Sequence, residues 1–148
     1  MVFFTKLGDS GLIWIILTLL CLYSDKYRKL GAAMTFSLVV ALLLGNEILK
    51  ELIRRPRPFT LNEISLLIPP PSGFSFPSGH TMASFAAAGA ICFTHKKLGK
   101  WALILATLIS FSRMYLYVHF PTDVLCGVLF GLLFGYMGCV IIYKKFRF

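Results

Sequence analysis

The sequence predicts an all-α fold, an integral membrane bundle of about five transmembrane helices that forms one domain over residues 1–148. Three observations support this prediction. The chain is 57% hydrophobic and only 14% charged, which leaves more apolar surface than a soluble domain of this size can bury. The apolar residues form runs close to the length of a membrane-spanning helix, about 20 residues. Short basic loops separate these runs, as they do at membrane boundaries.

The expected spans follow the apolar runs in order. They cover residues 11–23, with a start as early as residue 7, then 31–53, 78–94, 101–118 and 122–143. The first span is short, and residues 1–10 lack the basic start and cleavage site of a signal peptide. In the last span, Gly127, Gly131 and Gly135 recur every four residues. This spacing predicts close packing against another helix of the same bundle.

The second span is expected to end before Pro56 and Pro58, because proline disfavours helical geometry in the residue that precedes it. Residues 59–77 then form the longest connection in the chain. A connection of this length is typical of a lid or a binding loop. The alternative is a surface loop that rests at the lipid interface.

Basic residues are divided between the two expected sides of the membrane. Residues 24–30, 95–100 and 143–148 each carry three Lys or Arg residues, and with five spans these segments lie on one side. We expect that side, with the C-terminus, to be cytoplasmic, because cytoplasmic loops are enriched in Lys and Arg. The opposite side holds a second basic group, at Lys6, Lys50, Arg54, Arg55, Arg57 and Arg113. Arg54 and Arg55 either attract anionic head groups or anchor the helix.

Composition also argues against several classes of function. The net charge of +9 is not carried by a separate basic domain, so no nucleic-acid partner is expected. The cysteines lie in apolar runs without a Cys-x-x-Cys pair, at Cys21, Cys92, Cys126 and Cys139. They are expected to be small buried side chains, not a disulfide framework or a zinc site. Five scattered acidic residues form no Mg²⁺ or Ca²⁺ site, at Asp9, Asp25, Glu47, Glu51 and Glu63. We therefore expect chemistry without a metal or other cofactor.

Three polar stretches interrupt the apolar sequence. In the stretch 112–123, His119 and Asp123 are four residues apart, so one helical turn would place them on one face. A carboxylate beside an imidazole fixes its tautomer and makes the other ring nitrogen a better base or nucleophile. Arg113 adds a fork of donors suited to a phosphate or carboxylate. The alternative is a helix end with a satisfied histidine and a snorkelling arginine.

The other two stretches carry cations and backbone donors. Lys50 and Arg57 bracket a helix end, which taken alone is equally typical of a solvated basic terminus. Ser78 is a candidate N-cap, Gly79 allows a close backbone approach to an anion, and His80 projects from the first helical turn. A free helix N-terminus offers amides to phosphate, and the alternative is a plain capping motif.

All three stretches are expected at the outer membrane face. The set would then comprise three cations, two donors and two histidines, a composition suited to a phosphoryl group whose charge the cations offset. The three stretches together resemble the signatures of the type-2 phosphatidic acid phosphatase superfamily of membrane lipid phosphatases. Those signatures, Lys-x6-Arg-Pro, Pro-Ser-Gly-His and Ser-Arg-x5-His-x3-Asp, occur in this order between Lys50 and Asp123. Membrane members have six spans, so the resemblance implies that the first is short or missing here.

The resemblance also implies roles for individual residues. His119 would be the nucleophile that forms a phosphohistidine, and Asp123 would orient and polarise it. His80 would protonate the leaving oxygen and then activate water. The phosphate would be held by Lys50, Arg57, Ser78, Gly79 and Arg113, and no metal is implied.

The expected function is hydrolysis of a lipid phosphate or diphosphate by a multi-pass protein of the cell membrane, at its outer face. The resemblance extends to undecaprenyl-diphosphate phosphatases, with phosphatidic acid, phosphatidylglycerol phosphate and lipid A phosphates as alternative substrates. Two other functions stay open at this point. One is a phosphotransferase that passes the phosphate to another lipid or sugar. The other is a non-catalytic membrane protein, such as a transport subunit or an anion-binding partner.

Overall fold

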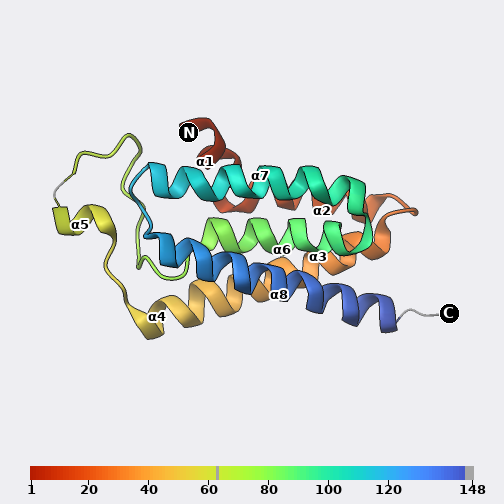
Figure 1. Cartoon of the computed structure of the whole chain (residues 1–148). Helices are drawn as coiled ribbons and strands as arrows, with labels where there is room; N and C mark the ends of the chain where they lie inside the picture. The colour runs from red at the N-terminus through yellow and green to blue at the C-terminus, as the bar shows by residue number, and fades with distance from the viewer. Residues whose placement is uncertain (63, 146–148) are drawn as a thin grey trace.

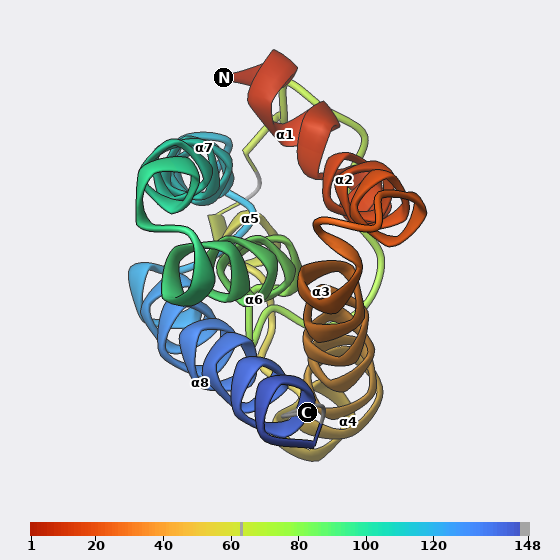
Figure 2. The same ribbon diagram turned by 90° about the vertical axis from the view of Figure 1, so that its right-hand side faces the viewer.

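The computed structural model describes residues 1–62 and 64–145, and within them the chain forms helices and no strands. Five long helical segments lie along one another in a bundle (Figures 1 and 2). They are formed by Val2–Gly8 (α1) with Leu12–Tyr23 (α2), Arg28–Val40 (α3) with Lys50–Ile53 (α4), Gly79–Thr94 (α6), Lys96–Tyr115 (α7) and Pro121–Lys145 (α8). The remaining elements are Asp9–Gly11 (η1), the π-helical segment Ala41–Leu49 (η2) and the short Pro58–Asn62 (α5). The predicted fold class, an all-helical membrane bundle, is confirmed.

The first segment is longer than the sequence indicated. Helix α1 begins at Val2, and the segment bends at η1, where Ser10 (φ 53°) and Gly11 (φ 68°) adopt left-handed geometry. The prediction placed its start at residue 11, or as early as residue 7, and the polar run Asp9-Ser10-Gly11 is typical of a helix start. In the structure this run is a bend inside a longer helical segment.

Helix α6 lies at the centre of the bundle, where it packs against α3, α7 and α8 (Figure 2). Its inner positions are small: Ala86, Ala87, Ala88 and Ala90 have no exposed surface. The predicted glycine face of α8 packs on this helix. A Cβ atom added at Gly131 would lie 2.6 Å from the backbone oxygen of Met82. The prediction that these glycines serve packing within the bundle is confirmed.

Three helical stretches in the described residues are long and apolar enough to cross a membrane: Val2–Tyr23, Arg28–Leu61 and Pro121–Lys144. Helix α6 is not among them because it has 16 residues, roughly 24 Å at 1.5 Å per residue. Its Ala, Gly, Ser and Thr residues face other helices, so it does not need the hydropathy of a lipid-facing helix.

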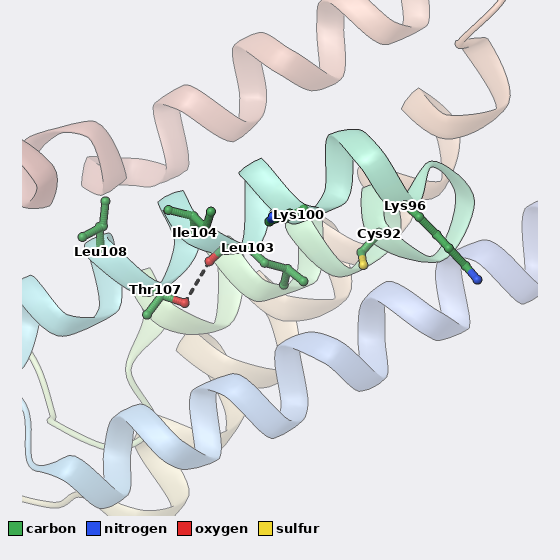
Figure 3. Close-up of a pocket in the computed structure, with 7 residues that line it drawn as sticks. All are labelled: Cys92, Lys96, Lys100, Leu103, Ile104, Thr107 and Leu108. Atoms are coloured by element: carbon green, nitrogen blue, oxygen red, sulfur yellow. Dashed lines mark hydrogen bonds between the residues drawn. The ribbon is translucent and has the colours of Figure 1, made fainter.

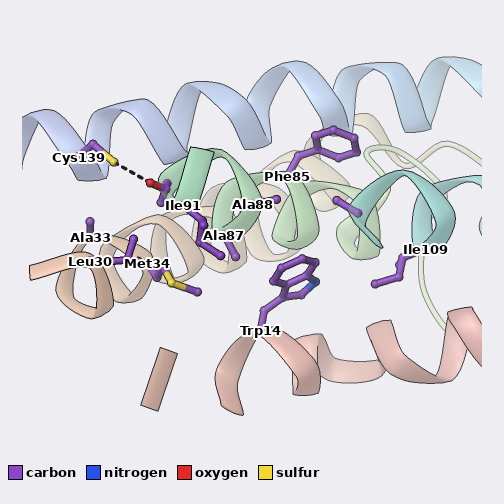
Figure 4. Packing of buried hydrophobic residues seen from close by; sticks show 12 residues of the cluster. Trp14, Leu30, Ala33, Met34, Phe85, Ala87, Ala88, Ile91, Ile109 and Cys139 are labelled. Carbon is purple, nitrogen blue, oxygen red and sulfur yellow. Dashed lines mark hydrogen bonds between the residues drawn. The ribbon is translucent and has the colours of Figure 1, made fainter. Parts of the chain in front are cut away.

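The core joins the first helical segment to the centre of the bundle (Figure 4). Trp14 of α2 is fully buried, and its indole Nε1 donates a 2.9 Å hydrogen bond to Ser84 Oγ of α6. Ile109 of α7 and Met34 of α3 belong to the same apolar cluster. All four cysteines are free, and Cys139 is buried as predicted, whereas Cys21, Cys92 and Cys126 are only partly buried. This packing fixes the first segment against the helices that carry the polar stretches.

The second helical segment ends at Ile53, as the prolines predicted, and Arg54 follows it in left-handed geometry (φ 48°). The connection to α6 includes the short helix α5, and its described residues from Ile64 to Ser78 form irregular backbone. Glu63, in this connection, and Arg147, counted in the last basic segment, lie outside the described residues.

Candidate active site

The three polar stretches meet at one end of the bundle, on the left in Figure 1. The chain after α4, the start of α6 and the junction between α7 and α8 come together there. Arg57 donates to the Val118 carbonyl at 3.1 Å, and the Ser78 amide donates to the Asp123 carbonyl at 3.1 Å. Arg57 and Val118, 61 residues apart in sequence, are therefore in direct contact.

His119 and Asp123 form a buried pair. His119 is 4% exposed and Asp123 is 0% exposed, and 3.6 Å separates His119 Nδ1 from Asp123 Oδ2. The two do not share a helical turn as the spacing predicted, because α8 begins at Pro121 and His119 lies in the preceding junction. The pair forms there because the Phe120 amide donates to Asp123 Oδ2 at 2.9 Å, which folds the junction back onto the first turn of α8.

The second ring nitrogen of His119 faces a cation. Its Nε2 lies 3.4 Å from Arg57 Nη1. Burial, the largest cause, lowers the pKa of His119 to about 4, so the ring is neutral near pH 7. A proton on Nδ1, facing Asp123, leaves the lone pair of Nε2 on the Arg57 side. A neutral, oriented imidazole beside a guanidinium is suited to attack an electrophile bound to that guanidinium.

Two further side chains hold the Asp123 carboxylate. Ser75 Oγ donates to Asp123 Oδ2 at 2.5 Å and lies 3.5 Å from His119 Nδ1. Arg55 Nη1 lies 2.8 Å from Asp123 Oδ1 and also donates to Thr122 Oγ1 at 2.6 Å. Sequence reasoning did not find Ser75, and it treated Arg55 as a head-group attractor or helix anchor. The structure gives Arg55 a different place, as the ionic partner of a buried carboxylate. No local pattern could show this, because 68 residues separate the two.

Arg57 is itself fixed by backbone oxygens. It is 5% exposed, its Nε donates to the Gly73 carbonyl at 2.9 Å, and its Nη2 donates to the Ser72 carbonyl at 3.0 Å. The connection between α5 and α6 thus wraps the guanidinium and sets its position beside His119. That contact agrees with the prediction of a binding loop rather than a free surface loop.

Lys50, Arg57 and Arg113 bring three positive charges close enough to repel one another. Arg113 is 3% exposed, and its Nε has no hydrogen-bond partner in the described part of the chain. Its Nη1 donates to Thr5 Oγ1. Three crowded cations, one with an unpaired buried donor, form a cradle for a multiply charged anion.

The start of α6 borders this cradle. Ser78 is the N-cap, as predicted: its Oγ accepts from the Thr81 amide at 3.4 Å. Because the Ser78 amide is bonded to Asp123 and the Thr81 amide to Ser78 Oγ, the first-turn amides left for an anion are those of Gly79 and His80. His80 lies within electrostatic reach of Arg113 and Lys50. All eight predicted site residues therefore belong to the three stretches that meet at this end of the bundle.

Other features of the surface do not join this cluster. The pocket in Figure 3, of about 480 Å³, lies along α6 and α7 and is lined mainly by apolar side chains with Lys96 and Lys100 at one end. It includes none of the predicted site residues. No three His, Cys, Asp or Glu side chains within residues 1–62 and 64–145 gather as metal ligands would. The expectation of metal-free chemistry stays a prediction.

Comparisons with known proteins agree with the resemblance that the three stretches carry. The family model described as the PAP2 superfamily matches residues 26–147. An undecaprenyl-diphosphatase of Sulfolobus acidocaldarius is 39% identical over 136 residues, which cover 88% of this chain and 64% of that protein. The undecaprenyl-diphosphatase BcrC of Bacillus subtilis is 31% identical over 93% of this chain and 70% of its own length. The chain thus spans about two thirds of the length of these relatives.

Two solved structures are similar throughout the bundle. The crystal structure of a transmembrane PAP2-type phosphatidylglycerolphosphate phosphatase from Bacillus subtilis has a TM-score of 0.79 at 33% identity, covering 100% of this chain and 77% of that one. The crystal structure of Aquifex aeolicus LpxE has a TM-score of 0.70 at 30% identity, covering 93% of this chain and 81% of that one.

Proposed function

Because the chain belongs to the PAP2 superfamily, we propose that it is an integral membrane phosphatase that hydrolyses a lipid phosphate or diphosphate through a phosphohistidine on His119. The observation that carries this proposal is the buried His119–Asp123 pair, in which the second ring nitrogen of His119, Nε2, lies 3.4 Å from Arg57 Nη1. An imidazole held in one tautomer and aimed at an anion cradle is the arrangement that nucleophilic phosphoryl transfer requires.

In the first step, His119 Nε2 attacks phosphorus as the bond from phosphorus to the leaving oxygen breaks. His80 gives its proton to that oxygen, so the leaving group departs neutral at that atom. In the second step, His80 takes a proton from water, the resulting hydroxide attacks phosphorus, and the phosphorus–nitrogen bond breaks. Inorganic phosphate leaves and His119 returns to its starting form.

The cations replace the charge that a metal supplies in other phosphatases. Lys50, Arg57 and Arg113 would bind the equatorial oxygens of the phosphoryl group, whose charge spreads in the transition state. Before substrate binds, these cations repel one another. Binding of a dianion removes that repulsion, so the cradle favours a phosphate over a neutral head group.

We propose undecaprenyl diphosphate as the substrate and the extracytoplasmic face as the location of the site. The substrate rests on the names of the two similar proteins. The orientation rests on the three basic segments, whose described residues lie at the end of the bundle opposite the junction between α7 and α8 and are typical of a cytoplasmic face (Figure 1). The C-terminus then lies in the cytoplasm.

The function is tested with the detergent-solubilised protein, a panel of lipid phosphates and diphosphates, and a chelator in every assay. We expect phosphate release with chelator present, highest on undecaprenyl diphosphate, and loss of release in His119→Ala. His95→Ala is the matched control, because His95 lies at the opposite end of the bundle, next to Tyr27. Phosphate release by His119→Ala, or its loss on chelation alone, would overturn the mechanism. Lipid consumption without phosphate release would favour a transferase.

A further inference from the structure

Asp9 reaches the candidate site from the first helical segment. Its Oδ1 lies 2.9 Å from His80 Nε2, a contact across 71 residues of sequence. Sequence analysis counted Asp9 only as one of several scattered acids, because the bend that aims it at α6 was not evident. The contact gives the site a second carboxylate–histidine pair, separate from His119 and Asp123.

The surrounding packing fixes this contact. Helix α1 packs against α7 and the start of α6. A Cβ atom added at Gly8 would lie 2.7 Å from Ile109 Cγ2 and 2.9 Å from His80 Cδ2, so only glycine permits this approach. Thr5 of α1, which is 2% exposed, accepts a hydrogen bond from Arg113 of α7. The segment from Thr5 to Asp9 therefore touches two of the residues assigned to phosphate chemistry.

The orientation of His80 follows from these contacts. Its Nε2 and Cδ2 atoms face Asp9 and Gly8, so the opposite edge of the ring, with Nδ1, points away from α1. A proton on Nε2 donated to Asp9 leaves Nδ1 to exchange the second proton with a leaving oxygen or with water. The ring then has one nitrogen for orientation and one for proton transfer.

Electrostatics favour a carboxylate at this position. Burial opposes protonation of the His80 ring most strongly, Arg113 from α7 and Lys50 from α4 oppose it further, and Asp9 from η1 is the charged group that favours it. A general acid must hold a proton before it can donate one. Asp123 cannot supply the balancing charge, because Arg55, Ser75 and the Phe120 amide occupy its oxygens.

We propose that Asp9 is a positioning residue that orients His80 and stabilises its protonated form for transfer of a proton to the leaving group. This proposal rests on the proposed phosphatase function. The Asp9 side chain is 59% exposed, so solvent screens part of its charge, and the fixed hydrogen bond carries much of the effect. The two carboxylates would then have separate roles: Asp123 orients the nucleophile, which burial keeps neutral, and Asp9 keeps the acid protonated.

The test compares two substrates that differ in their need for a proton. An alkyl lipid phosphate has a poor leaving group and requires general acid catalysis, whereas p-nitrophenyl phosphate releases a stable anion. In Asp9→Asn we expect kcat on the lipid phosphate to fall by roughly tenfold to a hundredfold. On the aryl phosphate we expect less than about a twofold change in the single-turnover release of p-nitrophenol, a step that precedes the activation of water, and this also shows that the variant is folded. The basic limb of the pH profile on the lipid should move to lower pH.

Asp25→Asn is the matched control, because Asp25 is an exposed acid paired with Arg28 in the loop between α2 and α3. It should leave both activities and the pH profile unchanged, and Asp9→Glu should recover part of the lipid activity. Equal losses on both substrates in Asp9→Asn, or an unmoved basic limb, would overturn the proposal and reduce Asp9 to a structural contact. Increased activity would also overturn it, by showing that Asp9 obstructs the cradle. A failure of the phosphatase proposal can be told apart from a failure of the Asp9 proposal, because the unaltered protein would then hydrolyse neither substrate.

Discussion

At the residue scale, the Asp123 carboxylate shows how a charge is stabilised within a membrane bundle. Arg55 and Ser75 reach its two oxygens at 2.8 Å and 2.5 Å, and the side chain has no exposed surface. The Arg55 guanidinium also lies 4.0 Å from the centre of the Phe120 ring. Removal of one partner from such a pair leaves a buried charge without compensation.

Replacement of Arg55 by glutamine is therefore expected to destabilise the protein. Because Arg55 is one third exposed (34%), we expect a loss of about 2 kcal/mol, below the roughly 3–5 kcal/mol of a fully buried pair. Arg54→Gln is the control, because the Arg54–Glu51 pair is mostly exposed and should contribute less than about 0.5 kcal/mol. Unfolding in detergent micelles measures both. Equal stability of the two variants would contradict the assigned role of Arg55.

The pKa of His119 leads to a prediction about pH. The ordinary value for histidine is about 6.5, and burial lowers it to about 4 here. The neutral, nucleophilic form therefore persists as the pH falls through 6.5 and is lost only near 4. With p-nitrophenyl phosphate, which needs no proton from His80, the single-turnover rate should stay constant from pH 8 to about 5. A decline centred near pH 6.5 would indicate a solvated histidine.

At the element scale, α8 depends on glycine for its approach to α6. At Gly131 an added Cβ would meet backbone at 2.6 Å, whereas at Gly89 of α6 the nearest atom is the flexible end of Leu132 at 3.3 Å. Gly131→Ala should therefore destabilise the bundle by about 2 kcal/mol and Gly89→Ala by less than about 1 kcal/mol. Thermal unfolding of both variants measures the difference. A Gly131→Ala protein as stable as Gly89→Ala would show that the two helices separate easily.

The positions of the helices were largely predictable from the sequence, but the bends and π-helical geometry within them were not. Pro56 and Pro58 predicted the end of the second helix at Ile53. Ser78 was recognised as an N-cap because it directly precedes an apolar run, which the local sequence shows. The bend at Ser10 and Gly11 was missed, since the same polar residues are typical of a helix start. The π-helical segment before Lys50 was also missed, because π-helices are rare and its residues continue the apolar run of the second span.

At the scale of the whole molecule, the sequence predicted which stretches converge but not what holds them. Charged residues are unfavourable in a membrane unless they share a site, so Lys50, Arg57, Arg113 and the two histidines could be grouped from hydropathy and topology. Asp9, Arg55 and Ser75 were not found, because each acts through a partner far away in sequence. Without a local pattern, only the three-dimensional arrangement identifies such supporting residues.

The proposed orientation predicts which end of the molecule is accessible from outside the cell. In a protein without its native cysteines, Leu67→Cys in the connection before α6 should react with a membrane-impermeant maleimide in intact cells, because Leu67 is 73% exposed. Lys97→Cys, at the start of α7, should react only after permeabilisation. The reverse pattern of labelling would place the site in the cytoplasm.

The central claim, a covalent phosphate on His119, is tested most directly by trapping the intermediate. In His80→Ala, ³²P-labelled p-nitrophenyl phosphate can still phosphorylate the protein, because its leaving group needs no proton, but activation of water is lost. We predict acid-labile, alkali-stable label on the His80→Ala protein and none on the His80→Ala/His119→Ala double variant. Label on the double variant, or turnover by the unaltered protein with no label trapped in His80→Ala, would contradict the account.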